Sequence, residues 1–108
     1  MARRDTQPLR LVHSDLIGPF PTPLYGGSRY VLTFIDDSSR LCWVYFLKLK
    51  SEVFEQLKIW KTLVETQSGN KINILRTDNV NEYVNNNLHN LCEECGIQIQ
   101  HSTPYTPQ

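Results

Sequence analysis

The stretch YVLTFIDDSSRLCWVYFL, residues 30–47, decides the fold. Tyr30 to Ile35 is a nearly continuous apolar and β-branched run, which indicates a buried strand. Leu41 to Leu47 is a second such run, rich in aromatic residues. The intervening residues Asp36 to Ser39 have the chemistry of a turn. Two strands joined by so short a turn predict a β-hairpin.

The segments on either side of this hairpin predict a mixed α/β sheet. Upstream, Leu9 to Asp15 is typical of a short strand, and a loop rich in glycine and proline follows it. Downstream, apolar residues from Val53 to Val64 recur at helical spacing behind Ser51, which is a favourable N-cap. The predicted strands are 9–15, 29–36, 41–47, 72–77 and 97–100, and the predicted helices are 51–67 and 83–95.

The order of these elements predicts the topology. Three strands come first as an antiparallel meander, and two helical crossovers then return parallel strands to the same sheet. The right-handed crossover rule places strand 72–77 beside strand 9–15 and parallel to it. Gly69 and Gly96 follow the helices, where a glycine C-cap is expected. We therefore expect one five-stranded mixed sheet with helices.

Composition limits the classes of protein that need to be considered. The length of 108 residues allows one domain, and we place a basic N-terminal extension at 1–8 and the domain at 9–108. No apolar run is long enough to span a membrane, and the start lacks the apolar segment of a signal peptide, so we expect an intracellular protein. A formal charge of zero argues against strong autonomous binding to nucleic acid.

The three cysteines do not suggest a disulfide framework. Cys92 and Cys95 form a C-x-x-C motif that could bind metal or carry redox chemistry. A zinc site needs a second pair of ligands, and His89 and His101 complete no familiar pattern. Because both cysteines lie on the apolar stripe of a predicted helix, we interpret them as buried thiols.

Two aspartates are candidates for a metal site. Asp15 and Asp78 stand at the predicted ends of the first and fourth strands. If those strands are parallel neighbours, both carboxylates lie at the edge where open α/β sheets bind ligands. A divalent cation such as Mg²⁺ relieves the repulsion between two close carboxylates. Aspartates also commonly end strands and cap turns, so position by itself leaves the structural interpretation open.

Several motifs carry a resemblance to a known family. They are, in order, HSDLIGP (13–19), GSRY (27–30), TFIDDSSR (33–40), WVYFLK (43–48), KSEVF (50–54), LRTDN (75–79) and TPYTPQ (103–108). Together they resemble the integrase core of copia-type retrotransposon Pol polyproteins, which is related to retroviral integrases and has an RNase H-like fold. The resemblance covers Leu9 to Gln108 and is highly specific.

The resemblance implies a function and its site residues. Asp15 and Asp78 match the first two members of the family's D, D, E triad, which binds Mg²⁺ or Mn²⁺ and catalyses end processing and strand transfer of DNA. The third acid is expected beyond Gln108, so the domain is expected to be a partial core that is inactive by itself. A two-metal site, a homo-oligomer and a nuclear location for the integration step are expected of the complete protein.

One departure keeps an alternative open. Val80-Asn81 replaces the Gly-Gly of the family pattern, and a β-branched residue resists the positive φ that glycine permits. The chain could therefore be a non-catalytic remnant, or a small module that binds nucleic acid or protein. A flavodoxin-like or response-regulator fold also places acids at strand ends, but the opening meander argues against it.

Several other polar and aromatic residues are candidates for a role at the site. Asn79 and Tyr105 are candidates for contact with substrate, whereas His13 is expected to be structural, Asp36 and Asp37 to form the turn, and Glu82 to favour a helix N-terminus. The aromatic residues of the second hairpin strand, Trp43, Tyr45 and Phe46, are expected in the core. We also expect an uncovered apolar surface, either on the helix face of Val53, Leu57 and Trp60 or on the sheet.

Overall fold

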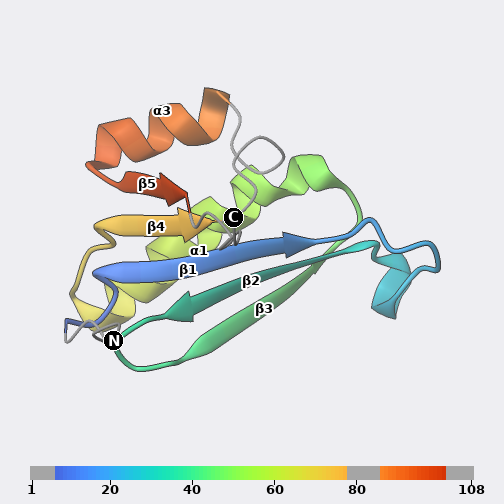
Figure 1. Ribbon diagram of the computed structural model, residues 1–108, viewed down its shortest axis with the longest axis horizontal. Coiled ribbons are helices and arrows are strands. Elements are labelled where there is room, and N and C mark those ends of the chain that lie inside the picture. Colours follow the sequence, from blue (N-terminus) through green and yellow to red (C-terminus); the bar gives the residue numbers. More distant parts are fainter. Residues whose placement is uncertain (1–6, 78–85, 102–108) are drawn as a thin grey trace, which may run out of the picture.

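The computed structural model describes residues 7–77 and 86–101 of the chain. Figure 1 shows a five-stranded sheet crossed by two helices. The strands are β1 (Leu11–Ile17), β2 (Tyr30–Asp36), β3 (Cys42–Leu47), β4 (Ile74–Thr77) and β5 (Gln98–His101). The helices are α1 (Val53–Ser68) and α3 (Asn86–Cys95), with short 3-10 turns η1 (Tyr25–Gly27) and η2 (Lys50–Glu52). This order confirms the predicted sequence of elements.

The sheet has the predicted strand order, β3-β2-β1-β4-β5. β2 pairs antiparallel with both β1 and β3, whereas β4 pairs parallel with both β1 and β5. The meander and the two parallel crossovers are thereby confirmed. Since β1 lies between the hairpin and β4, it is the strand on which the two halves of the sheet meet.

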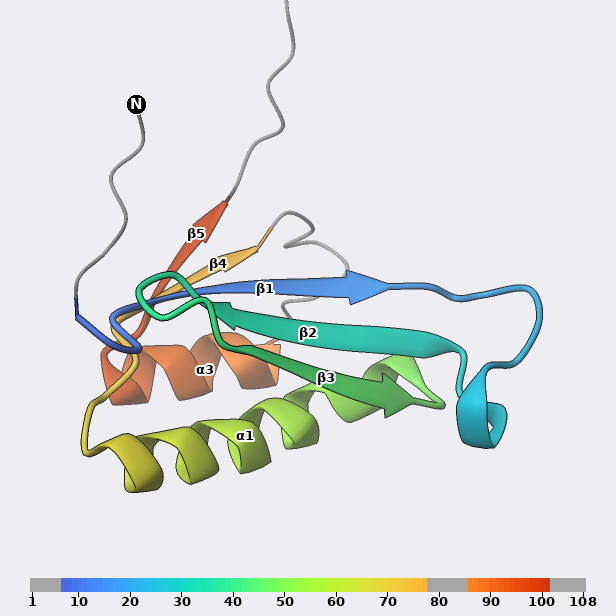
Figure 2. The same cartoon turned by 90° about the horizontal axis from the view of Figure 1, so that it is seen from below.

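Both helices lie on one face of the sheet (Figure 2). Alternate strand residues point toward the helices and are buried there, as Val12, Leu32, Phe34 and Leu75 show. The Trp60 ring of α1 stacks on Phe34, with ring centroids 4.0 Å apart and an interplanar angle of 6°. Burial of these large rings supplies much of the hydrophobic stabilisation that holds α1 to the hairpin.

The opposite face of the sheet carries no described helix, and we call it the open face (Figure 2). Its described residues from β1 to β5 include His13, Asp15, Ile17, Val31, Thr33, Ile35, Val44, Phe46, Arg76 and Gln100. The uncovered apolar surface expected from the sequence is therefore on the sheet. The helix face of Val53, Leu57 and Trp60 is covered instead, because these residues are at most 4% exposed.

The open face also corrects one expectation about the aromatic residues of β3. Trp43 and Tyr45 point toward the helices and pack against the core, as predicted. Phe46 points the other way and is 50% exposed, so its placement in the core was wrong. An edge strand that is apolar on both faces does not reveal from sequence which face is covered.

The C-terminal ends of both helices agree with the prediction from sequence, whereas the start of α1 does not. Gly69 adopts φ 75° after α1 and donates its N–H to the carbonyl of Glu65, and Gly96 has φ 72° after α3. Ser51 is not the N-cap of α1, because it lies inside η2. Glu52 closes this start instead, since its Oε1 accepts the N–H groups of Lys48 and Leu49 at 2.8 and 2.6 Å.

The loop between β1 and β2 is held by its own contacts. Gly18 has φ 133°, and a Cβ there would lie 2.5 Å from the Arg29 carbonyl oxygen, so this position requires glycine. The guanidinium of Arg29 donates to the carbonyls of Phe20 and Pro21 at 2.9 and 3.2 Å. Within the described residues, we find no helix long and apolar enough to cross a membrane.

Candidate metal centre

Asp15 lies within β1, two residues before the strand ends at Ile17. The sequence placed it at the strand end, which is wrong because β2 continues to pair with β1 through Leu16 and Ile17. Ser14 and Leu16 are buried toward the helices, while Asp15 is half-buried on the open face. The pleat of the strand therefore directs this carboxylate away from the core.

The strand that ends just before Asp78 is paired with β1 beside Asp15. Ser14 of β1 is the register partner of Thr77, the last residue of β4, and Asp78 follows Thr77 in the chain. The predicted parallel pairing of these strands is confirmed. Asp78 itself lies outside the described residues, as do Asn79 and Tyr105, so their roles stay predictions.

The other polar residues around the hairpin have structural partners. The Nε2 atom of His13 lies 2.9 Å from Oδ1 of Asp37. Asp36 is 2% exposed, and its carboxylate accepts the N–H of Leu9 at 3.0 Å and the hydroxyl of Ser39 at 2.7 Å. The turn interpretation of Asp36 is confirmed, and Asp37 has a role that the sequence did not reveal.

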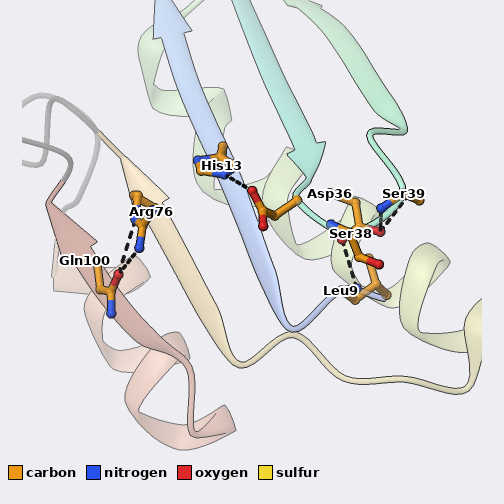
Figure 3. A network of polar contacts seen from close by, with 8 residues as sticks. Leu9, His13, Asp36, Ser38, Ser39, Arg76 and Gln100 are labelled. Atoms are coloured by element: carbon orange, nitrogen blue, oxygen red, sulfur yellow. Dashed lines mark hydrogen bonds and ion pairs between the residues drawn. The ribbon is translucent and has the colours of Figure 1, made fainter. Parts of the chain in front are cut away.

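A second polar pair on the open face was missed by the sequence analysis. Nε and Nη2 of Arg76 donate to Oε1 of Gln100 at 3.3 and 2.8 Å (Figure 3). Arg76 is the register partner of His13 in β1 and of Gln100 in β5. The sequence could have indicated the face on which Arg76 lies. Arg76 precedes Asp78 by two positions, and residues two apart in a strand point to the same face.

The cysteines do not provide a metal site in the described part of the chain. Cys92 is 2% exposed, as expected, but Cys95 is exposed, so its burial was wrongly predicted. Burial, helped by the charge of Cys95, raises the pKa of the Cys92 thiol to about 11. A thiol that stays protonated at neutral pH is a poor metal ligand. No group of three His, Cys, Asp or Glu side chains suited to a metal occurs among residues 7–77 and 86–101.

The chemistry of the described donors favours a hard cation. Asp15 presents carboxylate oxygens on an open, partly solvated surface, which suits Mg²⁺ because this ion prefers oxygen ligands and keeps several waters. The side chain of Thr33, across from Asp15 in β2, contacts the main-chain oxygen of Asp15 at 3.5 Å. This contact therefore involves the main chain of Asp15 and not its carboxylate.

Comparison with known families gives one match that covers nearly the whole chain. The model of the integrase core domain family matches residues 5–107. The Pol polyprotein of transposon TNT 1-94 from Nicotiana tabacum is 43% identical over 100 residues, which are 93% of this chain and 8% of that protein. The Pol polyprotein of transposon RE2 from Arabidopsis thaliana is 34% identical over 95% of this chain and 7% of its own length.

Solved structures support the fold. A chain of the simian T-cell lymphotropic virus intasome, in complex with the PP2A regulatory subunit B56 gamma, has a TM-score of 0.70 and 20% identity over 99% of this chain and 36% of its own. The HTLV-2 integrase catalytic core domain, in complex with magnesium in a trimeric form, has a TM-score of 0.64 and 16% identity over 87% of this chain and 60% of its own. The predicted RNase H-like integrase core fold is therefore confirmed.

Proposed function

Since this chain belongs to the integrase core domain family, as found in copia-type retrotransposon Pol polyproteins, we propose that it carries part of the catalytic site for DNA integration. The substrates in this proposal are the ends of the retrotransposon DNA and a target DNA. The chain spans about 8% of the length of the tobacco relative, and the activity of such a whole polyprotein is part of this proposal. We extend the proposal to a homo-oligomer acting in the nucleus.

One observation carries the proposal, the parallel register of β1 and β4. Ser14 and Thr77 are partners in that register, and the next residue of each strand is an aspartate. Neighbouring strands lie about 4.8 Å apart, so continuation of this register by one residue brings Asp15 and Asp78 within reach of a shared cation. Asp15 already points to the open face, which carries no described helix.

The proposed reaction has two steps of phosphoryl transfer. In end processing, a water oxygen forms a bond to phosphorus and the phosphodiester bond breaks to leave a 3′-hydroxyl. In strand transfer, that 3′-hydroxyl loses its proton, attacks a target phosphorus and displaces a target 3′-oxygen. Bound Mg²⁺ or Mn²⁺ supplies charge neutralisation for the attacking and leaving oxygens. Asp15 and Asp78 act as its ligands, and Asn79 and Tyr105 contact substrate.

The 108-residue polypeptide is proposed to be inactive alone, because the family's third acid has no counterpart in it. An oligonucleotide joining assay with Mn²⁺ tests this. We expect no joining by the polypeptide, and joining by a chimera that continues after Gln108 with the corresponding segment of the tobacco relative. Asp15→Asn abolishes the activity of the chimera. Joining by the polypeptide alone contradicts its inactivity, and a silent chimera carrying Val80→Gly and Asn81→Gly contradicts the catalytic proposal.

A second candidate, a non-catalytic binding module, is favoured by Val80-Asn81 in place of the family's Gly-Gly. Those two positions decide between the candidates in the same assay. If the chimera joins DNA only after Val80→Gly and Asn81→Gly, the catalytic site of this chain has degenerated and the binding module is the better description. If the unmodified chimera already joins DNA, the catalytic function stands.

A further inference from the structure

Arg76 and Gln100 form an oriented pair on the β4–β5 side of the open face. They are register partners in adjacent parallel strands, and both are half-buried. Two nitrogens of the guanidinium, Nε and Nη2, donate to the same oxygen of Gln100 (Figure 3). A shared acceptor for two donors fixes the plane of the guanidinium and leaves the hydrogens of Nη1 for another ligand.

This pair lies on the open face close to Asp15, on the strands β4 and β5 that follow β1 in the sheet. Arg76 is the register partner of His13, and Asp15 is two residues further along β1 on the same face. The spacing of residues and strands in a sheet places the Cα atoms of Arg76 and Asp15 about 8 Å apart. The guanidinium itself is held toward Gln100 on β5, the side of β4 away from β1, so it faces a ligand that lies beside Asp15 and not a group bound by Asp15.

The charge of Arg76 has no carboxylate partner in the described part of the chain. The ion pairs found there join His13 to Asp37, Lys58 to Glu55, Lys61 to Glu65 and His89 to Glu93. Gln100 is neutral, and the guanidinium is permanently charged. A half-buried cation of fixed orientation therefore faces the open surface beside Asp15, and its planar donors suit the oxygens of a phosphate.

We propose that Arg76 binds a phosphate of the DNA strand next to the acidic centre, and that Gln100 positions its guanidinium for this contact. The inference rests on the proposed function, since it takes DNA as the substrate. It adds a cationic contact to a chain whose formal net charge is zero. The purpose of the contact is to hold the negatively charged backbone beside the carboxylate of Asp15, which repels it.

The test is the salt dependence of DNA binding by the 108-residue chain. A fluorescein-labelled duplex is titrated at KCl concentrations from about 50 to 200 mM, and anisotropy gives the binding constant at each. One lost phosphate contact lowers the slope of log K against log salt by about 0.9. We expect this change for Arg76→Gln and none for Lys58→Gln, which removes an exposed charge on α1, on the opposite face.

Two further variants separate charge from folding. Arg76→Lys keeps the charge but not the two-donor contact with Gln100, so its slope stays near that of the unchanged chain. Gln100→Leu keeps the arginine and weakens binding with a smaller change in slope. Equal slopes for Arg76→Gln and the unchanged chain would overturn the proposal. An equal fall in slope for Arg76→Lys and Arg76→Gln would also overturn it, because the effect would then come from a disturbed pairing of β4 with β5 and not from the charge.

The proposed function is measured separately by calorimetric titration of Mn²⁺. Retained metal binding that depends on Asp15, together with no DNA binding by the unchanged chain, overturns the Arg76 contact and leaves the metal site standing. Absence of metal binding, together with a slope that falls in Arg76→Gln, overturns the metal site and supports the phosphate contact.

Discussion

Ser14 in β1 and Thr77 in β4 are register partners, and each is followed in the chain by an aspartate. Ser14 and Thr77 are 5% and 2% exposed on the helix face, so the pleat turns the next position of β1, Asp15, to the open face. If the register continues by one residue, Asp78 would stand beside Asp15, and two such carboxylates repel each other unless a cation or a proton joins them. The register of Ser14 and Thr77 therefore supports the proposed cation site.

The first prediction concerns metal binding at that site. The 108-residue chain should bind Mn²⁺ weakly, because two carboxylates leave most of the coordination sphere to water. Asp15→Asn and Asp78→Asn should each lower the affinity at least about tenfold, as loss of a charged ligand from a two-carboxylate site implies. Calorimetric titration measures this, with Glu55→Gln on α1 as the control. Unchanged affinity in Asp78→Asn would exclude the site.

The second prediction concerns Asp36 and the stability of the hairpin. This carboxylate is 2% exposed and accepts hydrogen bonds from Leu9, Ser38 and Ser39, so it ties the start of β1 to the turn after β2. Asp36→Ala leaves buried donors without an acceptor and should lower the free energy of unfolding by about 2–3 kcal/mol. Urea denaturation measures the loss.

Ser39→Ala is the matched control for this substitution. It removes the hydroxyl that donates to Asp36 at 2.7 Å and accepts the N–H of Leu41 at 3.2 Å, but it leaves the carboxylate and its backbone donors in place. The expected cost is about 1–2 kcal/mol, that of two ordinary hydrogen bonds of which one is exposed. Equal costs for the two variants would show that the buried carboxylate contributes little beyond its contact with Ser39.

The sequence predicted the sheet because each element carried its own periodicity. The apolar runs of the hairpin, the helical spacing of Val53 to Val64 and the glycines at 69 and 96 all agree with the structure. The strand order followed from the crossover rule, since a helix between two strands of one sheet leaves few arrangements. These features are local, or follow from general rules of chain connection.

The features that the sequence misplaced depend on tertiary contacts. The end of β1 was predicted too early. His13, Ser14 and Asp15 are three consecutive polar residues and so suggest the end of a strand, although Ser14 is buried in the structure. Phe46 was placed in the core because nothing local tells which face of an edge strand is covered. The pairing of Arg76 with Gln100 requires the register of β4 and β5, which no single segment encodes.

The third prediction concerns alkaline pH and Cys92. Burial raises the pKa of this thiol from 9.0 to about 11 in the folded chain. Between those values the unfolded chain loses the proton while the folded chain keeps it. The contribution of this thiol to the free energy of unfolding is therefore fully present below pH 9 and is lost as the pH rises toward 11. Cys92→Val should flatten this fall. Urea denaturation at several pH values measures it.

Other groups contribute to the same pH range and remain in the variant. Burial raises the pKa of Tyr45, and for Lys61 the effect of burial is outweighed by the hydrogen bond and charge of Glu65, which raise its pKa. The decline should therefore be reduced in Cys92→Val and not abolished. Cys42→Ser, at an exposed thiol, is the control and should leave the decline unchanged. Parallel curves for Cys92→Val and the unchanged chain would contradict the assignment.

The fourth prediction concerns self-association through the open face. Ile17, Val44 and Phe46 are 46–50% exposed there, and the Tyr25 ring of the β1–β2 loop lies 6.3 Å from that of Phe46. Exposed apolar area of this kind promotes association, and an edge strand offers unpaired backbone groups beside it. The 108-residue chain should therefore form dimers or larger species at micromolar concentration.

Phe46→Thr removes the largest of these side chains from β3 while keeping a residue suited to a strand. It should shift the weight-average mass measured by sedimentation equilibrium toward 12.6 kDa. Ile59→Gln removes a comparably exposed apolar side chain from α1, on the other face, and should leave the association unchanged. If Ile59→Gln dissociates the chain while Phe46→Thr does not, the contact is formed by the helices, and the open face is not the surface that associates.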